Sequence, residues 1–197
     1  MTGMNRALAF ASVFALSLAA APAALAGEVG DQLRGRLDRV VQILEDPALK
    51  ARPEARRTAL RGAATEIFDF TEITRRSLGR HWQTATPAER DELVHLFTAL
   101  LERSYVGRVE QFNGERVAVV GETRDGELAT VRTRLVSKNG TETAVDYRLS
   151  RAGDRWLAYD VSVEGVSLVA NYRAQFNKII QASSAQGLVQ RLRAKQE

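Results

Sequence analysis

The fold of this chain is determined by residues 125–154, which read DGELATVRTRLVSKNGTETAVDYRLSRAGD. Apolar and polar side chains alternate through this stretch with a period of two, the pattern of strands with one buried face. Asp125-Gly126 and Asn139-Gly140 predict tight turns, because both residue types tolerate positive φ. Ala152-Gly153-Asp154 supplies a third turn. Three short turns in succession predict an antiparallel meander.

The meander is expected to have four strands, near residues 115–123, 127–137, 141–151 and 155–164. Side chains of alternate positions share a face. One face is expected to be apolar and to carry Val117, Val119, Ala129, Val131, Thr133, Leu135, Val145, Tyr147, Leu149, Leu157, Tyr159 and Val161. The other is expected to be mostly polar and to carry Arg132, Arg134, Asp146, Arg148, Trp156 and Asp160.

Helices are predicted before and after the strands in the sequence. Apolar residues recur at intervals of three and four in residues 29–44, with Pro47 ending that helix, and further helices are expected from Pro53 and from about residue 71. Thr86-Pro87-Ala88-Glu89 is a capping-box start for a long helix with an apolar face up to residue 112.

After the sheet, a helical segment is expected from Val166 to about Leu192, with Ser167 as its cap and Gly187 as its break point. An antiparallel sheet with one apolar face and several amphipathic helices gives an α+β fold, with the helices covering that face.

Residues 1–26 are typical of an export signal. Arg6 is their only charge, an apolar run follows, and Ala24-Leu25-Ala26 matches a cleavage site. An uncleaved membrane anchor is the alternative interpretation. Residues 27–197 are then expected to form a single domain. Loss of Arg6 lowers the net charge from +4 to +3. A basic chain suits nucleic acid, anionic headgroups or an acidic partner, and export disfavours nucleic acid.

The residues offer little for catalysis. The chain has no cysteine and two histidines, His81 and His95, which disfavours a zinc site. It lacks a P-loop, and Gly165-Val166-Ser167 does not continue as a nucleophile elbow. The apolar face presents no carboxylate or imidazole as a general base. No enzymatic activity, catalytic residue, metal or cofactor is therefore expected.

Several blocks resemble one family. They are residues 78–90 (LGRHWQTATPAER), residues 156–160 (WLAYD), residues 164–176 (EGVSLVANYRAQF) and Gly187-Leu188. In this order and spacing, over roughly residues 29–192, the chain resembles the MlaC family of periplasmic phospholipid carriers. The family is also known as toluene-tolerance or ABC-transporter auxiliary substrate-binding proteins.

The resemblance implies a cup-like fold with an apolar cavity between sheet and helices, in which the acyl tails of a glycerophospholipid lie. It implies a carrier that maintains outer-membrane lipid asymmetry. The implied partners are an outer-membrane lipoprotein–porin complex and an inner-membrane ABC transporter with a ring of MCE domains.

Strand alternation and the family's cavity together predict which side chains line the lipid tails. The predicted set is Leu78, Phe97, Leu100, Leu101, Tyr105, Val131, Leu135, Val145, Tyr147, Leu149, Leu157, Tyr159, Val161, Val166, Val169 and Tyr172. Glu164 and Arg173 are candidates for contact with a headgroup or a partner, although structural salt bridges are the favoured interpretation.

Three alternatives stay open. The chain is a carrier of another apolar ligand (a hopanoid, a sterol or an aromatic solvent), an enzyme on a similar cup, or a periplasmic adaptor with a filled core. For any single apolar residue, packing in the core is favoured over ligand contact.

Overall fold

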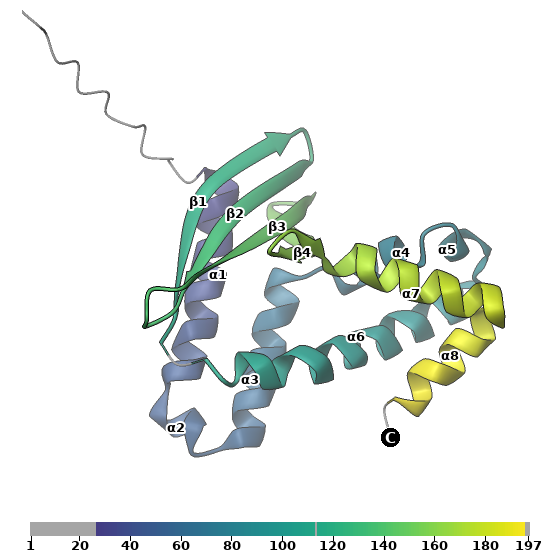
Figure 1. The fold of residues 1–197 in the computed structure, drawn as a ribbon, viewed down its shortest axis with the longest axis horizontal. Coiled ribbons are helices and arrows are strands. Elements are labelled where there is room, and N and C mark those ends of the chain that lie inside the picture. Colours follow the sequence, from purple (N-terminus) through teal and green to yellow (C-terminus); the bar gives the residue numbers. More distant parts are fainter. Residues whose placement is uncertain (1–26, 113, 196–197) are drawn as a thin grey trace, which may run out of the picture.

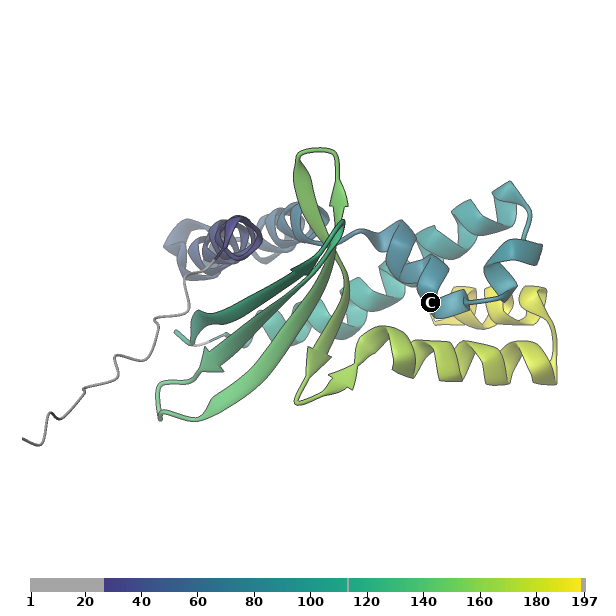
Figure 2. The ribbon, with the colours of Figure 1, turned by 90° about the horizontal axis from the view of Figure 1, so that it is seen from above.

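The computed structural model describes residues 27–112 and 114–195 and confirms the α+β class. The predicted export signal, residues 1–26, lies outside the described residues. Figure 2 shows α1 and α3 on one side of the sheet and α4, α5, α7 and α8 on the other. Within the part of the chain that the structure describes, no helix has the length and apolar character needed to cross a bilayer.

The first three helices are α1 (Glu28–Glu45), α2 (Pro47–Lys50) and α3 (Pro53–Ile67). Helix α1 ends before Pro47, as expected, but Pro47 also opens α2, which was not predicted. The side chain of Asp46 caps this single turn by accepting from the Ala48 N–H at 2.7 Å. In Figure 1, α1 passes behind the sheet and continues below it to α2.

The next three helices are α4 (Phe70–Leu78), α5 (His81–Thr84) and α6 (Pro87–Val109). The capping box of α6 is confirmed. The Thr86 hydroxyl accepts from the Glu89 N–H at 3.3 Å, and the Glu89 carboxylate accepts from the Thr86 N–H at 2.8 Å. Figure 1 shows α6 running from α7 and α8 back toward α3.

The sheet contains β1 (Arg116–Asp125), β2 (Leu128–Val136), β3 (Glu142–Ala152), β4 (Arg155–Val163) and β5 (Val166–Ser167), antiparallel and in that order. The predicted meander is confirmed, but the sheet has five strands where four were predicted. The short β5 forms because Glu164 and Gly165 both have positive φ, 48° and 79°, the sense of twist that a two-residue hairpin turn requires.

A bulge in β4 changes the predicted faces. Tyr147 pairs with Val161, but Leu149 pairs with Ala158, so β4 contains one extra residue between these pairs. Trp156 therefore shares the face of Leu149 and is 1% exposed. The predictions that Trp156 lies on the polar face and Leu157 on the apolar face are wrong, because a bulge reverses the alternation beyond it.

The chain ends in α7 (Leu168–Ala182) and α8 (Ala185–Ala194). Ser167 caps α7 as predicted, accepting from the Ala170 N–H at 3.0 Å. The break between the two helices lies at Ser183 and Ser184, and Gly187 lies inside α8, so the predicted break point is wrong. Ser184 explains the position, since its hydroxyl caps α8 by accepting from the Gly187 N–H at 3.1 Å.

Two hydrophobic cores hold the molecule together. One joins α4, α6, α7 and α8 through Ile73, Leu78, Leu93, Leu96, Phe97, Leu100, Leu101, Val169, Phe176, Leu188, Val189 and Leu192. The other joins the sheet to α1 and α3 through Val29, Leu33, Ile67, Ala129, Val131, Leu149, Trp156 and Ala158.

Candidate functional site

Six of the predicted lining residues lie in or against the helical core. Leu78, Phe97, Leu100, Leu101 and Val169 are buried there, and Tyr172 packs against them. The aromatic rings meet edge to face, with the Phe97 ring centroid 4.8 Å from that of Tyr172 and 4.9 Å from that of Phe176. Such contacts are those of a packed interior.

Two further predicted residues, Val131 and Leu149, belong to the sheet core. Both are fully buried, and they pack in one cluster with Val29 and Leu33 from the first half of α1. The first half of α1 thus covers this part of the apolar sheet face. Figure 1 shows the start of α1 beside the upper end of the sheet. The structure places these two strand residues in a different core from the six helical residues.

Four predicted residues lie at the other end of the same sheet face and are only half-buried. They are Leu135, Val145, Tyr147 and Val161. Directly opposed residues in an antiparallel pair share a face, so the register extends this surface to Val117, opposite Leu135, and to Val163, opposite Val145. Val163 is 48% exposed. We call these six residues the open patch.

Tyr147 lies at the centre of the open patch, paired with Val131 on one side and Val161 on the other. Its side chain is packed against the sheet core yet keeps some exposed surface. Burial raises the pKa of its phenol to about 12. Tyr147 therefore lies at the boundary between the covered and the incompletely covered part of this sheet face.

The second half of α1 lies beside this surface. Leu37 and Val40 are half-buried and pack against the sheet core, whereas Val29 and Leu33, earlier in the helix, are fully covered. The helix therefore closes one end of the sheet face and leaves the other incompletely covered. Full burial of an aliphatic side chain stabilises by about 1.5–3 kcal/mol, so the open patch retains an unused capacity to bind apolar groups.

The remaining predicted residues are dispersed. Tyr105 on α6 and Val166 on β5 are 37% and 66% exposed. Tyr159 is buried beneath the guanidinium of Arg76, which lies 3.7 Å from its ring centroid. Leu157 pairs with Ser150 on the face opposite the open patch.

The favoured interpretation of Glu164 and Arg173 as salt-bridge residues is wrong. The Glu164 carboxylate accepts from the Ala144 N–H at 2.5 Å, and the Arg173 Nε donates to the Arg76 carbonyl at 2.8 Å. Both side chains bond to the backbone of another element, and the sequence spacing gives no indication of either contact.

Three residues in or beside the open patch, Val163, Leu37 and Val40, are absent from the predicted lining set. Val163 has the same strand parity as Val161, and Leu37 and Val40 belong to the apolar stripe of α1. Their positions were therefore readable as apolar, but nothing in the pattern distinguishes a half-open site from a filled core. The described residues contain no group of three or more His, Asp and Glu side chains placed to hold a metal ion.

Surface recesses lie elsewhere among the described residues, away from the open patch. One, of about 850 Å³, lies between α7 and the corner formed by α4 and α5. Another, of about 560 Å³, lies near the start of α6, beside Trp82 and His95.

Three comparisons with known proteins point to the same family. The family model described as MlaC protein matches residues 35–194. The chain is 25% identical over 134 residues to the toluene tolerance protein ttg2D of Pseudomonas putida, a match that spans 67% of this chain and 62% of that protein. A solved structure of a phospholipid-binding protein from Ralstonia solanacearum, in complex with a phospholipid, is 27% identical, with a TM-score of 0.76 over 84% of this chain and 95% of that one.

The fold and the open patch define an α+β protein whose sheet is covered by helices at one end of its apolar face and only partly at the other. The extent of the family match settles its classification: the chain belongs to the MlaC protein family.

Proposed function

We propose that this protein is a periplasmic phospholipid carrier that exchanges lipid between an outer-membrane lipoprotein–porin complex and an inner-membrane ABC transporter with MCE domains, and so maintains outer-membrane lipid asymmetry. Family membership and the similarity to a structure solved with a phospholipid support this proposal. The open patch is the observation in this chain that carries it.

The physical need for such a carrier is large. Each methylene group removed from water gains about 0.8 kcal/mol. A two-chain lipid with about thirty methylenes thus faces a cost of roughly 24 kcal/mol to cross water unprotected. A protein that covers the tails removes most of this cost. The proposed role is binding and release, without a chemical step.

We propose that the acyl tails contact the open patch and the second half of α1. Leu135, Val145, Tyr147 and Val161 are the predicted lining residues that lie there. The other predicted lining residues that are buried serve in this proposal as interior packing. Residues 1–26 act in this proposal as a cleaved signal, and sequencing the amino terminus of protein from a periplasmic fraction tests that step.

The test compares two leucines on one strand. Leu135→Asp places a carboxylate in the open patch, whereas Leu128→Asp places one at the other end of β2 on the opposite face, where Leu128 is already 42% exposed. A charge in an apolar site is costly unless it is paired. We expect protein purified from a membrane-bearing host to retain phospholipid, Leu128→Asp to retain the same amount, and Leu135→Asp to lose most of it.

Organic extraction and mass spectrometry of the folded proteins provide the measurement, with circular dichroism as the folding control. Equal lipid content in both variants would contradict the assignment of the open patch. Recovery of a hopanoid, a sterol or an aromatic solvent in place of phospholipid would support the alternative of a carrier for another apolar ligand.

A further inference from the structure

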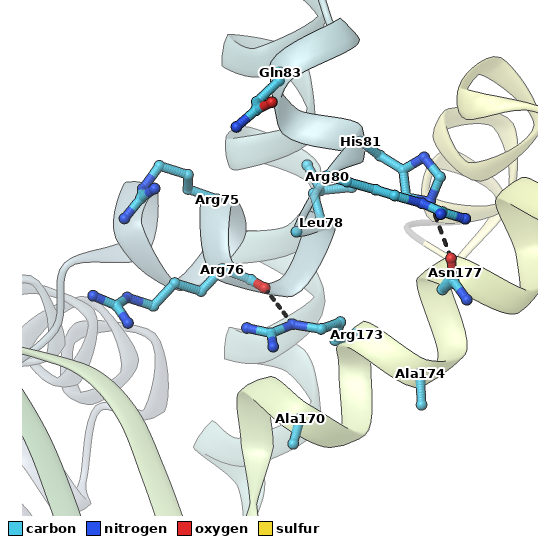
Figure 3. Close-up of a pocket in the computed structure, with 11 residues that line it drawn as sticks. Arg75, Arg76, Leu78, Arg80, His81, Gln83, Ala170, Arg173, Ala174 and Asn177 are labelled. Carbon is cyan, nitrogen blue, oxygen red and sulfur yellow. Dashed lines mark hydrogen bonds between the residues drawn. The ribbon is translucent and has the colours of Figure 1, made fainter.

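The recess of about 850 Å³ between α7 and the α4–α5 corner has a lining unlike that of the open patch (Figure 3). Four of its residues are arginines, namely Arg75, Arg76, Arg80 and Arg173. None of the described residues that line it is acidic. The recess is open to solvent, and its apolar side chains are those of Leu78, Ala170 and Ala174.

The positive charge of this recess is only partly compensated. The carboxylate of Glu72, on α4, is shared between Arg75 and Arg76, whose Nε atoms lie 2.5 and 2.6 Å from its oxygens. Arg173 donates to a backbone carbonyl, and the side chain of Arg80 has no hydrogen bond or ion pair within the described residues. A recess lined by charges of one sign concentrates the potential and attracts the opposite charge.

The walls of the recess are held in place before any ligand arrives. His81 on α5 is hydrogen-bonded to Asn177 on α7 at 3.1 Å, and Arg173 on α7 reaches the backbone of Arg76 on α4 (Figure 3). Gly79, with φ of +55°, turns the chain between α4 and α5. A preformed site of this kind binds with less loss of conformational entropy than a flexible one.

The shape of the recess favours an extended ligand. Figure 3 shows the guanidinium groups distributed from Arg75 and Arg76 at one end to Arg80 at the other, rather than converging on one point. The face of α7 between them presents Ala170 and Ala174, one turn apart, which let a chain approach closely. The volume is within the range of organic-ligand pockets and exceeds what a single inorganic anion fills.

We infer that this arginine recess is a docking site for an acidic segment of a partner protein, one that carries several carboxylates in sequence. Guanidinium groups pair with carboxylates through two parallel charge-assisted hydrogen bonds, which makes arginine suited to this contact. The inference rests on the recess itself and does not depend on lipid binding at the open patch.

The test uses the full chain and a fluorescein-labelled peptide of alternating glutamate and alanine, with the glutamine–alanine peptide as the uncharged probe. Fluorescence anisotropy is recorded for the wild type, for Arg80→Gln/Arg173→Gln, and for Arg116→Gln/Arg191→Gln, which removes the same charge from exposed sites on β1 and α8. Arg80→Gln alone serves if the first double variant is misfolded.

We expect the acidic peptide to bind, the glutamine peptide not to bind, and affinity to fall by about tenfold or more in Arg80→Gln/Arg173→Gln. The matched variant Arg116→Gln/Arg191→Gln should bind as the wild type does. Equal weakening in both double variants would mean general charge attraction and would overturn the inference. The inference would also be overturned if inorganic phosphate bound as tightly as the peptide. A further contrary result would be no binding of the peptide together with binding of phosphatidylglycerol vesicles that depends on Arg80 and Arg173.

Discussion

Glu72 shows how one side chain balances a cluster of like charges. Its carboxylate contacts the guanidinium groups of Arg75 and Arg76, and the hydrogen bond from Arg75 is the main reason that the pKa of Glu72 lies below its ordinary value. A carboxyl with a depressed folded-state pKa stabilises the fold above its unfolded-state pKa, and this stabilisation is lost as pH falls through the folded-state value.

Glu72→Gln should therefore lower the free energy of unfolding at pH 7 by up to about 1 kcal/mol, the range of partly exposed ion pairs. The difference from the wild type should shrink as pH falls below about 4, near the unfolded-state pKa of glutamate, and continue to shrink toward lower pH. Urea unfolding at a series of pH values measures it. Glu45→Gln is the control, because Glu45 is exposed and its side chain has no hydrogen bond or ion pair within residues 27–112 and 114–195. A difference that is constant with pH would contradict this account.

The contacts of individual side chains were harder to predict from the sequence than the helices and strands. Glu164 and Arg173 lie in a recognisable family block, yet their bonds to Ala144 and Arg76 cross 20 and 97 residues of chain. Alternation and helical periodicity report which side of an element a residue occupies. They carry no information about which distant backbone group lies there.

Between elements, Asp160 connects the sheet to the start of α7. It is 3% exposed, although it lies on the face of β4 opposite the open patch. Its carboxylate accepts from the Ser167 hydroxyl at 2.6 Å and from the Val169 N–H at 3.0 Å, and Arg148 approaches at 3.5 Å. The negative charge thus lies at the amino terminus of α7, where the helix dipole favours it.

Asp160→Ala should lower the free energy of unfolding by about 1.5–3 kcal/mol, because buried donors lose a charged acceptor. Asp146→Ala, on the neighbouring strand and the same face, should change it by less than about 0.5 kcal/mol. Urea unfolding monitored by circular dichroism measures both. Equal effects in the two variants would show that Asp160 does not anchor α7.

The elements themselves were largely readable. Turn sequences with glycine at positive φ located the hairpins, and Thr86, Glu89 and Ser167 marked helix starts that the structure confirms. The bulge in β4 and the break at Ser183 were not readable. Both depend on how neighbouring elements pack. A regular strand and a bulged strand can have the same local pattern of apolar and polar residues.

For the molecule as a whole, the sequence predicted a single apolar sheet face covered by helices. In the structure, the predicted lining residues are instead distributed among different environments. Leu78 and Phe97 belong to a core of four helices, Leu149 to a core closed by α1, and Tyr147 to the half-open end of the sheet. Composition and spacing cannot separate these environments, because filled and unfilled apolar surfaces use the same residue types.

Two surfaces of different chemistry follow from this architecture. The open patch is apolar and lies on the sheet face that α1 covers incompletely. The arginine recess is polar and lies among α4, α5 and α7, on the other side of the sheet from α1 (Figure 2). Because the two proposed sites share no residue, a mutation in one can be made without changing the other.

We propose above that the open patch holds hydrocarbon chains. A crystal structure of the protein purified with its co-purified lipid tests this most directly. We expect continuous acyl density in contact with Leu135, Val145 and Tyr147. Side chains that close this end of the sheet completely, or lipid density bound elsewhere with the patch empty of it, would contradict the claim.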